Sequence, residues 1–481
     1  MNNLKTDKFY INGQWVAPKA SQILEVIDPA TEQPLCNIAL GNQQDVDAAV
    51  NAAKEAFTSY STTPVKDRIE LLEKILTVYK RRYDEMAGLI CKELGAPMFL
   101  SEKAQAKVGE GHLEATISAL KNFDAEYKNE EGDLIIREPI GVCGLITPWN
   151  WPINQIALKV FPAIAVGCTV VLKPSEVTPL NALLFAEILD EAGVPAGVFN
   201  LVNGDGISVG AALSRHPDVQ MMSFTGSTRA GTNVSKDAAD TVKRVTLELG
   251  GKSPNIIFPD ADLKRAIKQG ILQCFLNTGQ NCNAPTRMLI HQSQYDEAKV
   301  IAAEVVSKIL VDDPTKQGRH LGPVVSKQQF DRIQTLMQIA IDEGASLVAG
   351  GLGRPDGFEK GYFVRPTVFA DVDNSATICQ EEVFGPVLVM ISYEDENDAI
   401  GIANDTPYGL AAYVQTADET TAMRVMRRLR AGMVRINGSD IGYLSPFGGF
   451  KLSGNGREGG SFGLEDFCEV KAVAYPDWKS Q

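Results

Sequence analysis

Five short β-rich runs, each followed at once by a polar loop, constrain the fold of this chain more than any other feature. The runs VCGLIT, TVVLK, VFNLV, MMSFT and RVTLEL begin near residues 142, 169, 198, 221 and 244. Helical stretches rich in Ala and Leu fill most of the gaps, and the spacing of about 22 to 30 residues is typical of βαβ units in a parallel sheet. The loops PWNWP, PSEVTP, NGDG, GSTRAG and GGKSP would lie at the carboxyl ends of these strands, where open α/β sheets bind ligands. The sequence therefore predicts one crevice that collects all five loops.

The sequence before these runs predicts helices, and the sequence after them predicts a second domain. Residues 43–123 have a helical pattern, in which KDRIELLEKILTVYKRRYDEMAGLICKELG is one helix that we expect to stop at Gly95. The motif GEG at 109–111 has no third glycine and no preceding strand, so we interpret it as a helix interruption rather than a dinucleotide fingerprint. From residue 252 to residue 450 a second helix and strand alternation, with LGPVVS, PTVFADV, FGPVLVMIS and GLAAYV as strands, predicts a second α/β domain facing the first.

Composition and charge exclude several classes of function. The chain has 481 residues, of which 44% are hydrophobic and 22% charged, a profile that excludes disorder and fibres. Lys and Arg number 46 against 60 Asp and Glu, and the net charge of −14 has the wrong sign for binding nucleic acid or anionic lipid. The longest uncharged apolar stretch, 160–172, is far shorter than the ~20 residues that span a bilayer. We therefore expect neither nucleic acid nor membrane as a partner.

The cysteines and histidines indicate a reducing compartment and predict no metal site. Eight cysteines are scattered without a CxxC pair, and the N-terminus has no apolar segment of the secretory type, so we expect a cytoplasmic protein. None of the four histidines forms an i, i+4 pair, and no Cys/His cluster is visible.

The segment GQNCNAPTR holds the most informative cysteine. Cys282 is flanked by polar, turn-forming residues, which predicts an accessible thiol, whereas we expect the other seven cysteines to be buried core residues. A free thiol has a pKa near ~8.5, and only about 3% of it is thiolate at pH 7. A nucleophilic role for Cys282 therefore requires a lowered pKa or a nearby base.

Two further side chains with suitable chemistry follow strands of the same sheet. Glu248 in LELGGKSP would be held at the mouth of the crevice, where partial burial raises a carboxyl pKa toward neutrality and suits a general base. The alternative is a glutamate that only caps backbone N–H groups. Asn150 in TPWNWP has an amide that can stabilise developing oxyanion charge, with an Asx turn before Pro152 as its alternative.

The same loops carry signals for phosphate binding. In FTGSTRAG, Gly226 and Gly231 allow the backbone to approach a pyrophosphate closely at a helix N-terminus. In KPSE, Lys173 and Glu176 stand where they can bind the hydroxyls of an adenosine ribose, and the acidic residue disfavours a 2′-phosphate, which favours NAD over NADP. An ordinary βα turn is the alternative for both.

Taken in order, these motifs resemble those of the aldehyde dehydrogenase superfamily, in its hydrolytic, NAD(P)-dependent branch. The matching pieces run from the first sheet to the C-terminus: ITPWNWP, LKPSE, FTGSTRAG, LELGGKSP, GQNCNAPTR, EEVFGP, NDTPYGLAAYV and PFGGFKLSGNGRE. The resemblance implies an α/β fold with a Rossmann-type cofactor domain, an α/β catalytic domain and a small β oligomerisation arm. It also implies that the protein oxidises an aldehyde to the carboxylic acid with NAD, NADP being the other possible cofactor.

For catalysis, the resemblance implies roles for five residues. Cys282 adds to the aldehyde to form a thiohemiacetal, and Asn150 with the backbone N–H of Cys282 forms the oxyanion hole. After the hydride has passed to the nicotinamide, Glu248 activates the water that hydrolyses the thioester. Lys159 and Glu458 match positions that assist proton transfer.

The resemblance also implies a cofactor site and a substrate pocket. The cofactor residues match contacts to the adenosine ribose, the pyrophosphate and the nicotinamide half: Ile146, Trp149, Lys173, Ser175, Glu176, Gly206, Phe224, Gly226, Ser227, Leu249, Glu382 and Phe384. The pocket positions are apolar or neutral, which favours a medium aliphatic or aromatic aldehyde: Trp151, Ile153, Asn154, Leu158, Asn281, Asn283, Ile441 and Phe447.

Two other functions stay open at this point. A CoA-acylating semialdehyde dehydrogenase would release the thioester to CoA, but such relatives typically lack the glutamate found here at position 248. A catalytically inactive structural homologue would have lost the nucleophile or the base, and this sequence has both.

The resemblance divides the chain into three parts. Residues 1–120 and 140–250 match the NAD-binding domain, 251–450 the catalytic domain, and 121–139 with 468–481 the oligomerisation arm. The alternating apolar pieces DLIIREPIGV and CEVKAVAYP, which belong clearly to neither sheet, fall on or beside this arm, and exposed edge strands invite pairing. We therefore expect a homodimer or homotetramer.

Overall fold

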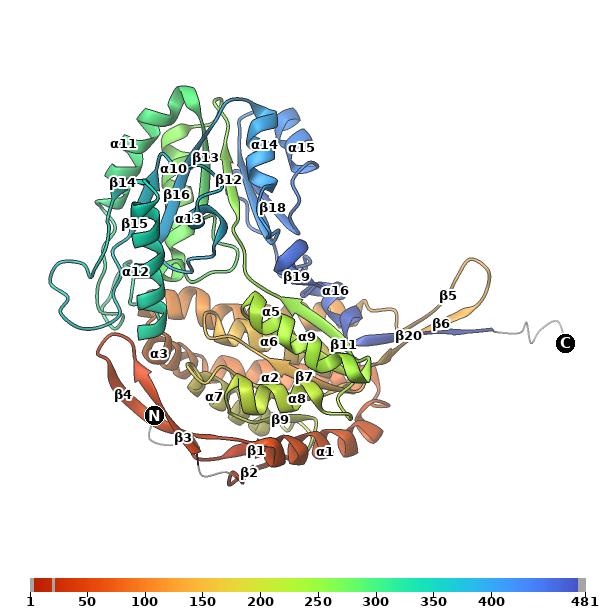
Figure 1. Ribbon diagram of the computed structural model, residues 1–481. Helices are drawn as coiled ribbons and strands as arrows, with labels where there is room; N and C mark the ends of the chain where they lie inside the picture. Colours follow the sequence, from red (N-terminus) through yellow and green to blue (C-terminus); the bar gives the residue numbers. More distant parts are fainter. Residues whose placement is uncertain (1–3, 20–21, 475–481) are drawn as a thin grey trace.

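A parallel sheet forms the centre of the first half of the protein, as Figure 1 shows. The computed structural model describes residues 4–19 and 22–474. The five predicted runs are β7 (Val142–Ile146), β8 (Thr169–Lys173), β9 (Phe199–Leu201), β10 (Met221–Thr225) and β11 (Arg244–Glu248). They lie in the order β11-β10-β7-β8-β9, and every neighbouring pair is parallel. The predicted parallel sheet is confirmed, and the loops after these strands share one edge of it.

Short strands from both ends of the chain extend this sheet. They are β1 (Phe9–Ile11), β2 (Gln14–Val16) and β19 (Gly454–Asn455), and all three pair in antiparallel fashion. A separate hairpin consists of β3 (Gln22–Asp28) and β4 (Gln33–Leu40). The sequence analysis predicted none of these strands. β1, β2 and β19 have only two or three residues and are too short to show alternation. β3 and β4, with seven and eight residues, were missed although they are long enough.

Helices cover both faces of the first sheet. They are α1 (Gln43–Tyr60), α2 (Val65–Arg81), α3 (Tyr83–Leu94), α4 (Met98–Leu100), α5 (Ala106–Lys121), α6 (Pro152–Val166), α7 (Leu180–Glu191), α8 (Ala211–Arg215), α9 (Thr228–Ala238) and α16 (Gly460–Asp466). Helix α6 starts with Pro152 at its first position and ends at Gly167 in a left-handed conformation. Every residue of α6 except Asn154 is buried, so this helix is the core between the sheet and the outer helices.

Two predictions in the helical region are wrong. The segment predicted as one helix is α2 and α3, which are separated at Arg82, although α3 does stop at Gly95 as expected. The GEG motif does not interrupt a helix, because it lies inside the continuous α5. The irregularity comes earlier, as a π-helical turn at residues 101–105.

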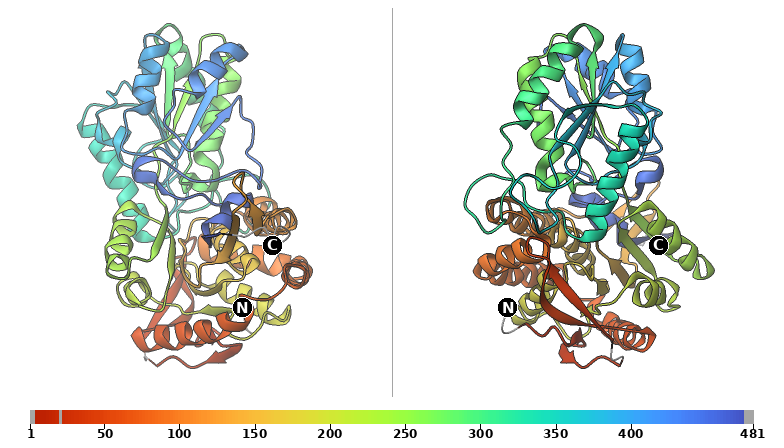
Figure 2. Two further views of the ribbon diagram at one scale, coloured as in Figure 1. Left: turned by 90° about the vertical axis from the view of Figure 1, so that its right-hand side faces the viewer. Right: turned by 60° about the vertical axis from the view of Figure 1, so that its left-hand side comes forward.

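The second half of the protein forms its own sheet. Its strands are β12 (Pro254–Ile257), β13 (Arg287–His291), β14 (Ser346–Ala349), β15 (Thr367–Ala370), β16 (Val387–Tyr393), β17 (Ala411–Gln415) and β18 (Met433–Ile436), in the order β14-β15-β16-β13-β12-β17-β18. Its helices are α10 (Leu263–Phe275), α11 (Tyr295–Val306), α12 (Lys327–Asp342), α13 (Thr377–Gln380), α14 (Glu396–Asn404) and α15 (Glu419–Met426). The views in Figure 2 show this unit packed over the first. LGPVVS was predicted as a strand, but it is a loop with one isolated bridge at Leu321.

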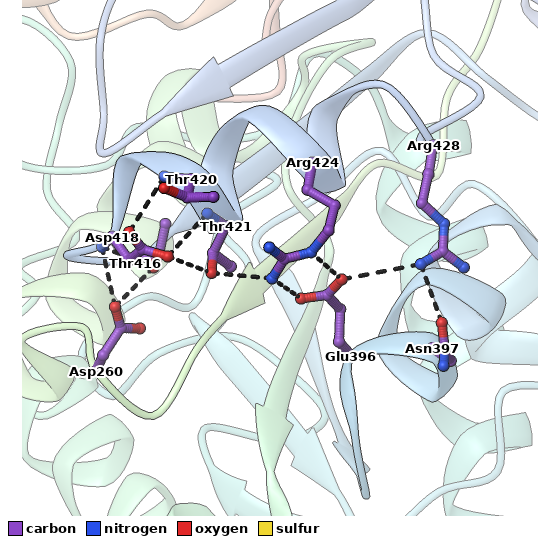
Figure 3. A network of polar contacts seen from close by, with 9 residues as sticks. All are labelled: Asp260, Glu396, Asn397, Thr416, Asp418, Thr420, Thr421, Arg424 and Arg428. Atoms are coloured by element: carbon purple, nitrogen blue, oxygen red, sulfur yellow. Dashed lines mark hydrogen bonds and ion pairs between the residues drawn. The ribbon is translucent and has the colours of Figure 1, made fainter.

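A network of polar contacts, drawn in Figure 3, holds the short helix α15 against α14. The guanidinium of Arg424 donates to both carboxylate oxygens of Glu396, at 2.7 and 2.6 Å. Asp418 caps α15 by accepting from Thr421 N at 2.9 Å, and Asp260 accepts from Asp418 N at 3.0 Å. Capping and a bidentate ion pair thus fix a helix too short to be stable alone.

A third, small sheet projects from the first unit, as Figure 1 shows. It consists of β5 (Glu126–Lys128), β6 (Leu134–Pro139) and β20 (Cys468–Val473), with β6 in the middle. The expectation that DLIIREPIGV and CEVKAVAYP belong to neither large sheet is confirmed for β6 and β20, which pair with each other. It is wrong for Val142, the last residue of DLIIREPIGV, which begins β7 and pairs with Thr169 in the first sheet. Residues 475–481 of the predicted arm lie outside the described residues. The division into three parts by residue number stays a prediction.

In the described ranges, the helices are all too short or too polar to cross a membrane. These ranges also contain no group of three or more His, Cys, Asp and Glu side chains placed to hold a metal ion.

Candidate active site

The loop after β11 meets the turn that carries Cys282. Before this turn, Asn277 and Thr278 both adopt left-handed backbone conformations, with φ of 53° and 56°. A Cβ atom at Gly251 would lie 2.4 Å from the carbonyl oxygen of Cys282. Only glycine fits there, so the GG pair in LELGGKSP allows the end of β11 to pass directly beside the cysteine turn.

Asn150, which follows β7, is bound to the same turn. The side-chain amide of Asn150 donates to the backbone oxygen of Gln280 at 3.0 Å. The backbone oxygen of Asn150 accepts from the side-chain amides of Gln105 and Asn277 at 3.1 and 2.8 Å. Asn150 is 3% exposed, so burial and the hydrogen bond to Gln280 fix the orientation of its side-chain amide. The structure places Asn150 beside the backbone of the cysteine turn, as the convergence of loops predicted.

The thiol of Cys282 lies at the edge of an apolar cluster with Leu410 and Tyr413. Burial raises the pKa of Cys282 well above its usual range, and the carboxyl groups of Glu382 and Glu248 raise it further. The backbone N–H groups of Asn283 and Cys282 act in the opposite direction. Cys282 was predicted to be an accessible thiol, and the structure shows it only half-buried. Six of the other cysteines are buried as predicted, but Cys36 is also half-buried.

Glu248 is the last residue of β11 and is almost fully buried. Neither of its carboxylate oxygens has a hydrogen-bond partner among the described residues. Burial raises the pKa of Glu248 well above its usual range, the nearby Glu458 carboxylate raises it further, and Lys159 and Arg457 lower it. Buried carboxylate oxygens of this kind require water or a ligand, so the site is suited to holding a reacting water.

Lys159 and Glu458 form a buried ion pair next to this carboxylate. The ammonium of Lys159 lies 2.5 Å from Glu458 Oε1 and donates to Ser223 Oγ at 3.0 Å. Their side chains are 1% and 10% exposed, while Glu458 Oε2 has no partner in the part of the chain that the structure describes. The two residues come from α6 and from the segment before α16, and only the fold brings them to Glu248.

The residues predicted for the cofactor lie along the carboxyl edge of the first sheet and on a loop of the second unit. Lys173 and Glu176 form an ion pair at 2.9 Å at the end of β8. The rings of Trp149 and Phe384 meet edge to face with centroids 5.3 Å apart. Glu382 Oε1 accepts from Gly251 N at 3.0 Å, and burial raises the pKa of Glu382 to about 7.

The other predicted cofactor residues occupy the ends of the neighbouring strands. Ser227 caps α9 by accepting from Ala230 N at 3.3 Å, and Gly226 N donates to Glu248 O at 3.0 Å. Four of the remaining positions are buried residues at strand ends or just after them: Ile146, Ser175, Phe224 and Leu249. Gly206 is exposed and begins a π-helical turn, Gly206–Gly210, after β9. Placed together, these residues form a polar edge at a helix N-terminus that fits an anionic dinucleotide.

The predicted pocket residues do not all lie around one cavity. Trp151 Nε1 donates to Asn281 Oδ1, which ties the start of α6 to the cysteine turn. Ile441 and Phe447 pack on the same apolar cluster as Cys282. The hydroxyl of Tyr413 donates a hydrogen bond to the backbone oxygen of Asn283 at 2.8 Å. Ile153 and Leu158 are buried in the core around α6, with 0% and 5% exposed.

Asn154 contacts residues that sequence reasoning did not find. Its Oδ1 lies 2.8 Å from His112 Nε2, and the rings of His112 and Tyr443 meet edge to face at 4.8 Å. Burial lowers the pKa of His112 to about 4, so this imidazole is neutral at physiological pH. No motif marked His112 or Gln105, because each reaches the site from a segment whose local pattern shows only a helix. Gln280 lies inside the motif GQNCNAPTR, but the sequence analysis assigned it no role.

The fold and the site define an α/β protein with a nucleotide-binding type of sheet that brings a thiol, an amide and a carboxyl group together. The family profile described as "Aldehyde dehydrogenase family" matches residues 15–473. This chain belongs to the aldehyde dehydrogenase family, whose members are oxidoreductases that act on aldehydes.

Relatives and solved structures cover almost the whole chain. A "3-succinoylsemialdehyde-pyridine dehydrogenase" from a Pseudomonas species is 52% identical over 467 residues, which are 97% of this chain and 98% of the relative. An aldehyde dehydrogenase structure from Bartonella henselae has a TM-score of 0.96 at 51% identity and covers 98% of this chain and 99% of that one. A mutant of aldehyde dehydrogenase C from Pseudomonas syringae, solved with NAD+ and octanal, has a TM-score of 0.96 at 47% identity, with 97% and 96% covered. The predicted family and fold class are confirmed.

Proposed function

We propose that this protein oxidises an aldehyde to the carboxylic acid with NAD, using Cys282 as nucleophile and Glu248 as general base. The observation that carries this assignment is the contrast between two neighbouring groups. Asn150 is locked to the cysteine turn, whereas both oxygens of the buried Glu248 carboxyl group lack partners among the described residues. An oxyanion donor should be rigid, and a base that binds water should have free oxygens.

The residues act in sequence on the substrate carbon. The Cys282 thiol releases its proton to solvent, its sulfur bonds to the carbonyl carbon, and the oxygen that becomes negative accepts hydrogen bonds from the Asn150 amide and from the N–H of Cys282. NAD, when bound, would supply the acceptor for the hydride that leaves this carbon. Glu248 takes a proton from the water that attacks the thioester, and the carbon–sulfur bond breaks to return Cys282 as thiolate. Lys159 and Glu458 lie next to Glu248 and assist the transfer of the proton from the Glu248 carboxyl group.

The residues at the sheet edge would hold the cofactor. Lys173 and Glu176 would bind the adenosine ribose, Ser227 the pyrophosphate, and Glu382 with Phe384 the nicotinamide half. Because the Glu176 carboxylate repels a 2′-phosphate, we expect kcat/KM to favour NAD over NADP. In Glu176→Gln this preference should shrink, and a parent enzyme that prefers NADP contradicts the assignment.

We propose a medium aliphatic or aromatic aldehyde as substrate. The Pseudomonas syringae relative was solved with octanal, and the Pseudomonas relative is named for a semialdehyde that carries a pyridine ring. The pocket positions contain no Lys or Arg for a carboxylate-bearing semialdehyde. A panel of aldehydes ranked by kcat/KM tests this proposal.

Two variants test the catalytic assignment. Cys282→Ala should lose aldehyde oxidation altogether. Glu248→Gln should give one rapid turnover of NADH followed by a steady rate at least about 10² lower, because the thioester forms but its hydrolysis lacks a base. Steady NADH formation that depends on CoA would instead support the CoA-acylating alternative, and an inactive parent enzyme would support a structural homologue.

We also propose a cytoplasmic homodimer or homotetramer. Eight free cysteines suit a reducing compartment, and the small sheet of β5, β6 and β20 is the oligomerisation arm. Residues 1–120 with 140–250, and 251–450, are the proposed NAD-binding and catalytic domains.

A further inference from the structure

A groove of about 330 Å³ lies between the two units, on a surface that the proposed reaction does not use. One wall is the end of α10 with Leu272 and Leu276, and another is formed by residues 308–310, with Leu310, and 318–321. The third wall is formed by residues 97–100 around α4. This volume is within the range of about 300–1,000 Å³ that is typical of small-molecule sites.

The walls of this groove are unusually apolar for a surface. Leu272, Leu276 and Leu310 are 49%, 42% and 68% exposed, and Phe99 lies beside them. Single exposed leucines are common in proteins, but three that line one concave surface indicate a place where an apolar ligand is bound.

The rim of the groove is cationic. Lys308 and Arg319 belong to its lining, which includes no Asp or Glu. Within the described ranges neither side chain forms an ion pair with a carboxylate, and the Arg319 guanidinium lies 4.9 Å from the centre of the Phe99 ring. Asp312, which lies between them in the chain, is paired with Lys316 at 2.7 Å. In a chain of net charge −14, two unpaired cations above an apolar groove favour a ligand with an apolar chain and an anionic end.

The floor of the groove is connected to the candidate active site. It contains Asn277 and Thr278, which are 3% and 2% exposed and carry the left-handed turn before Cys282. Asn277 Nδ2 donates to Asn150 O at 2.8 Å, and Thr278 Oγ1 donates to Gly322 O at 3.1 Å. A ligand in the groove would therefore press on the turn that fixes both the nucleophile and the oxyanion donor.

We propose that this groove is a second binding site, separate from the site at Cys282, for an amphipathic carboxylate with a medium-length alkyl chain. The chain lies on the leucines, and the carboxylate is held by Arg319 and Lys308. Because the product of aldehyde oxidation is itself a carboxylate, a bound product of this class slows catalysis from outside the active site. The binding claim stands on the chemistry of the groove, and only this feedback rests on the proposed function.

Binding to the full-length protein is measured by calorimetry with three probes. Octanoate should bind, whereas octan-1-ol lacks the charge and butyrate lacks the chain, so each should bind at least about tenfold more weakly. Arg319→Ala should weaken the binding of octanoate by about tenfold and leave the binding of octan-1-ol unchanged. Leu310→Glu should abolish octanoate binding, and its matched control is Leu347→Glu, at a leucine that is 49% exposed on β14 outside the groove.

Kinetics separate this site from ordinary product binding at Cys282. Octanoate should inhibit the parent without competing with the aldehyde, and Leu310→Glu should lose this inhibition while keeping the parent kcat/KM. The calorimetric result should be the same in Cys282→Ser, which makes the outcome independent of the catalytic assignment. Purely competitive inhibition that Leu310→Glu leaves unchanged overturns the proposal. A change of oligomeric state in Leu310→Glu without any octanoate binding to the parent also overturns it, since the groove would then be a contact between copies of the chain.

Discussion

Cys282 and Glu248 lie in surroundings that push both side chains toward their uncharged forms. Burial is the main cause in both cases, and each carboxyl group nearby adds to the shift of the thiol pKa. A buried thiol next to carboxyl groups is a poor nucleophile until a base or a bound cation changes its surroundings. We therefore expect Cys282 to react slowly with alkylating agents and oxidants when no ligand is bound.

This state of the thiol predicts a pH dependence. Because the pKa of Cys282 is raised, the thiolate fraction is small at neutral pH and grows about tenfold for each unit of pH. In the absence of cofactor, the rate of inactivation by iodoacetamide should thus rise from about pH 6 to pH 9 without levelling off. The measurement uses a Cys36→Ser background, because Cys36 is also partly accessible. A plateau below about pH 8 would show a stabilised thiolate and contradict the prediction.

The ion pair of Lys159 and Glu458 gives a second prediction for single residues. In Glu458→Gln the buried ammonium loses its partner, which should lower the free energy of unfolding by about 3–5 kcal/mol in urea. The control is Asp218→Asn, which breaks a pair of similar length, 2.6 Å from Lys54, whose side chains are 59% and 35% exposed. That change should cost no more than about 1 kcal/mol. Equal losses of unfolding free energy in the two variants would contradict the prediction that burial makes the ion pair of Lys159 and Glu458 more important for stability.

At the scale of elements, the position of α5 against its neighbours depends on glycine. A Cβ atom at Gly109 would lie 2.4 Å from Tyr79 Oη and 3.0 Å from Ile153 Cγ1. The hydroxyl of Tyr79 in turn donates to Ala106 O at 2.7 Å, so it cannot move without breaking this bond. The GEG motif, whose pattern indicated an interruption, instead permits close packing of α5 on α2 and α6.

Two substitutions of glycine by alanine should therefore have opposite effects. Gly109→Ala should destabilise the protein by about 1–3 kcal/mol, because the methyl group overpacks the contact with Tyr79. Gly88→Ala in α3 should stabilise it by about 0.5–1 kcal/mol, since no heavy atom lies within 4 Å of its Cβ position and alanine favours the helix. Thermal unfolding of both variants tests this pair of predictions. Stabilisation by Gly109→Ala would show that α5 can shift freely.

The sequence allowed prediction of those elements whose signal is local. The five runs of the first sheet have five or six residues each, which is long enough to show their β character. Asn150 follows the first run, Glu248 lies at the end of the last, and Cys282 lies on the turn that meets their loops. The break at Arg82 and the loop at LGPVVS escaped prediction because the apolar pattern continues through both. His112 and Gln105 escaped for another reason, since they gain a function only when α5 packs on α6.

At the scale of the whole molecule, the small sheet of β5, β6 and β20 exposes apolar side chains in a single chain. Strand β20 pairs with β6 along its whole length, but Val470 at its centre is 67% exposed and Tyr127 on β5 is 40% exposed. A three-stranded sheet that projects from the body has little apolar area to pack on, so we expect a second copy of the chain to cover it.

The arm predicts how the protein sediments. The parent should sediment as a dimer or tetramer at micromolar concentration, and Val470→Asp should shift it toward the monomer, because a buried charge without a partner opposes the contact between copies. Ile23→Asp is the matched control, since Ile23 is also 67% exposed but lies on β3 outside the arm, and it should keep the parent's oligomeric state. Unchanged far-UV circular dichroism in Val470→Asp would separate dissociation from unfolding. A parent protein that sediments as a monomer would contradict the prediction. A Val470→Asp variant that sediments like an oligomeric parent would also contradict it, because the sheet of β5, β6 and β20 would then not hold the subunits together.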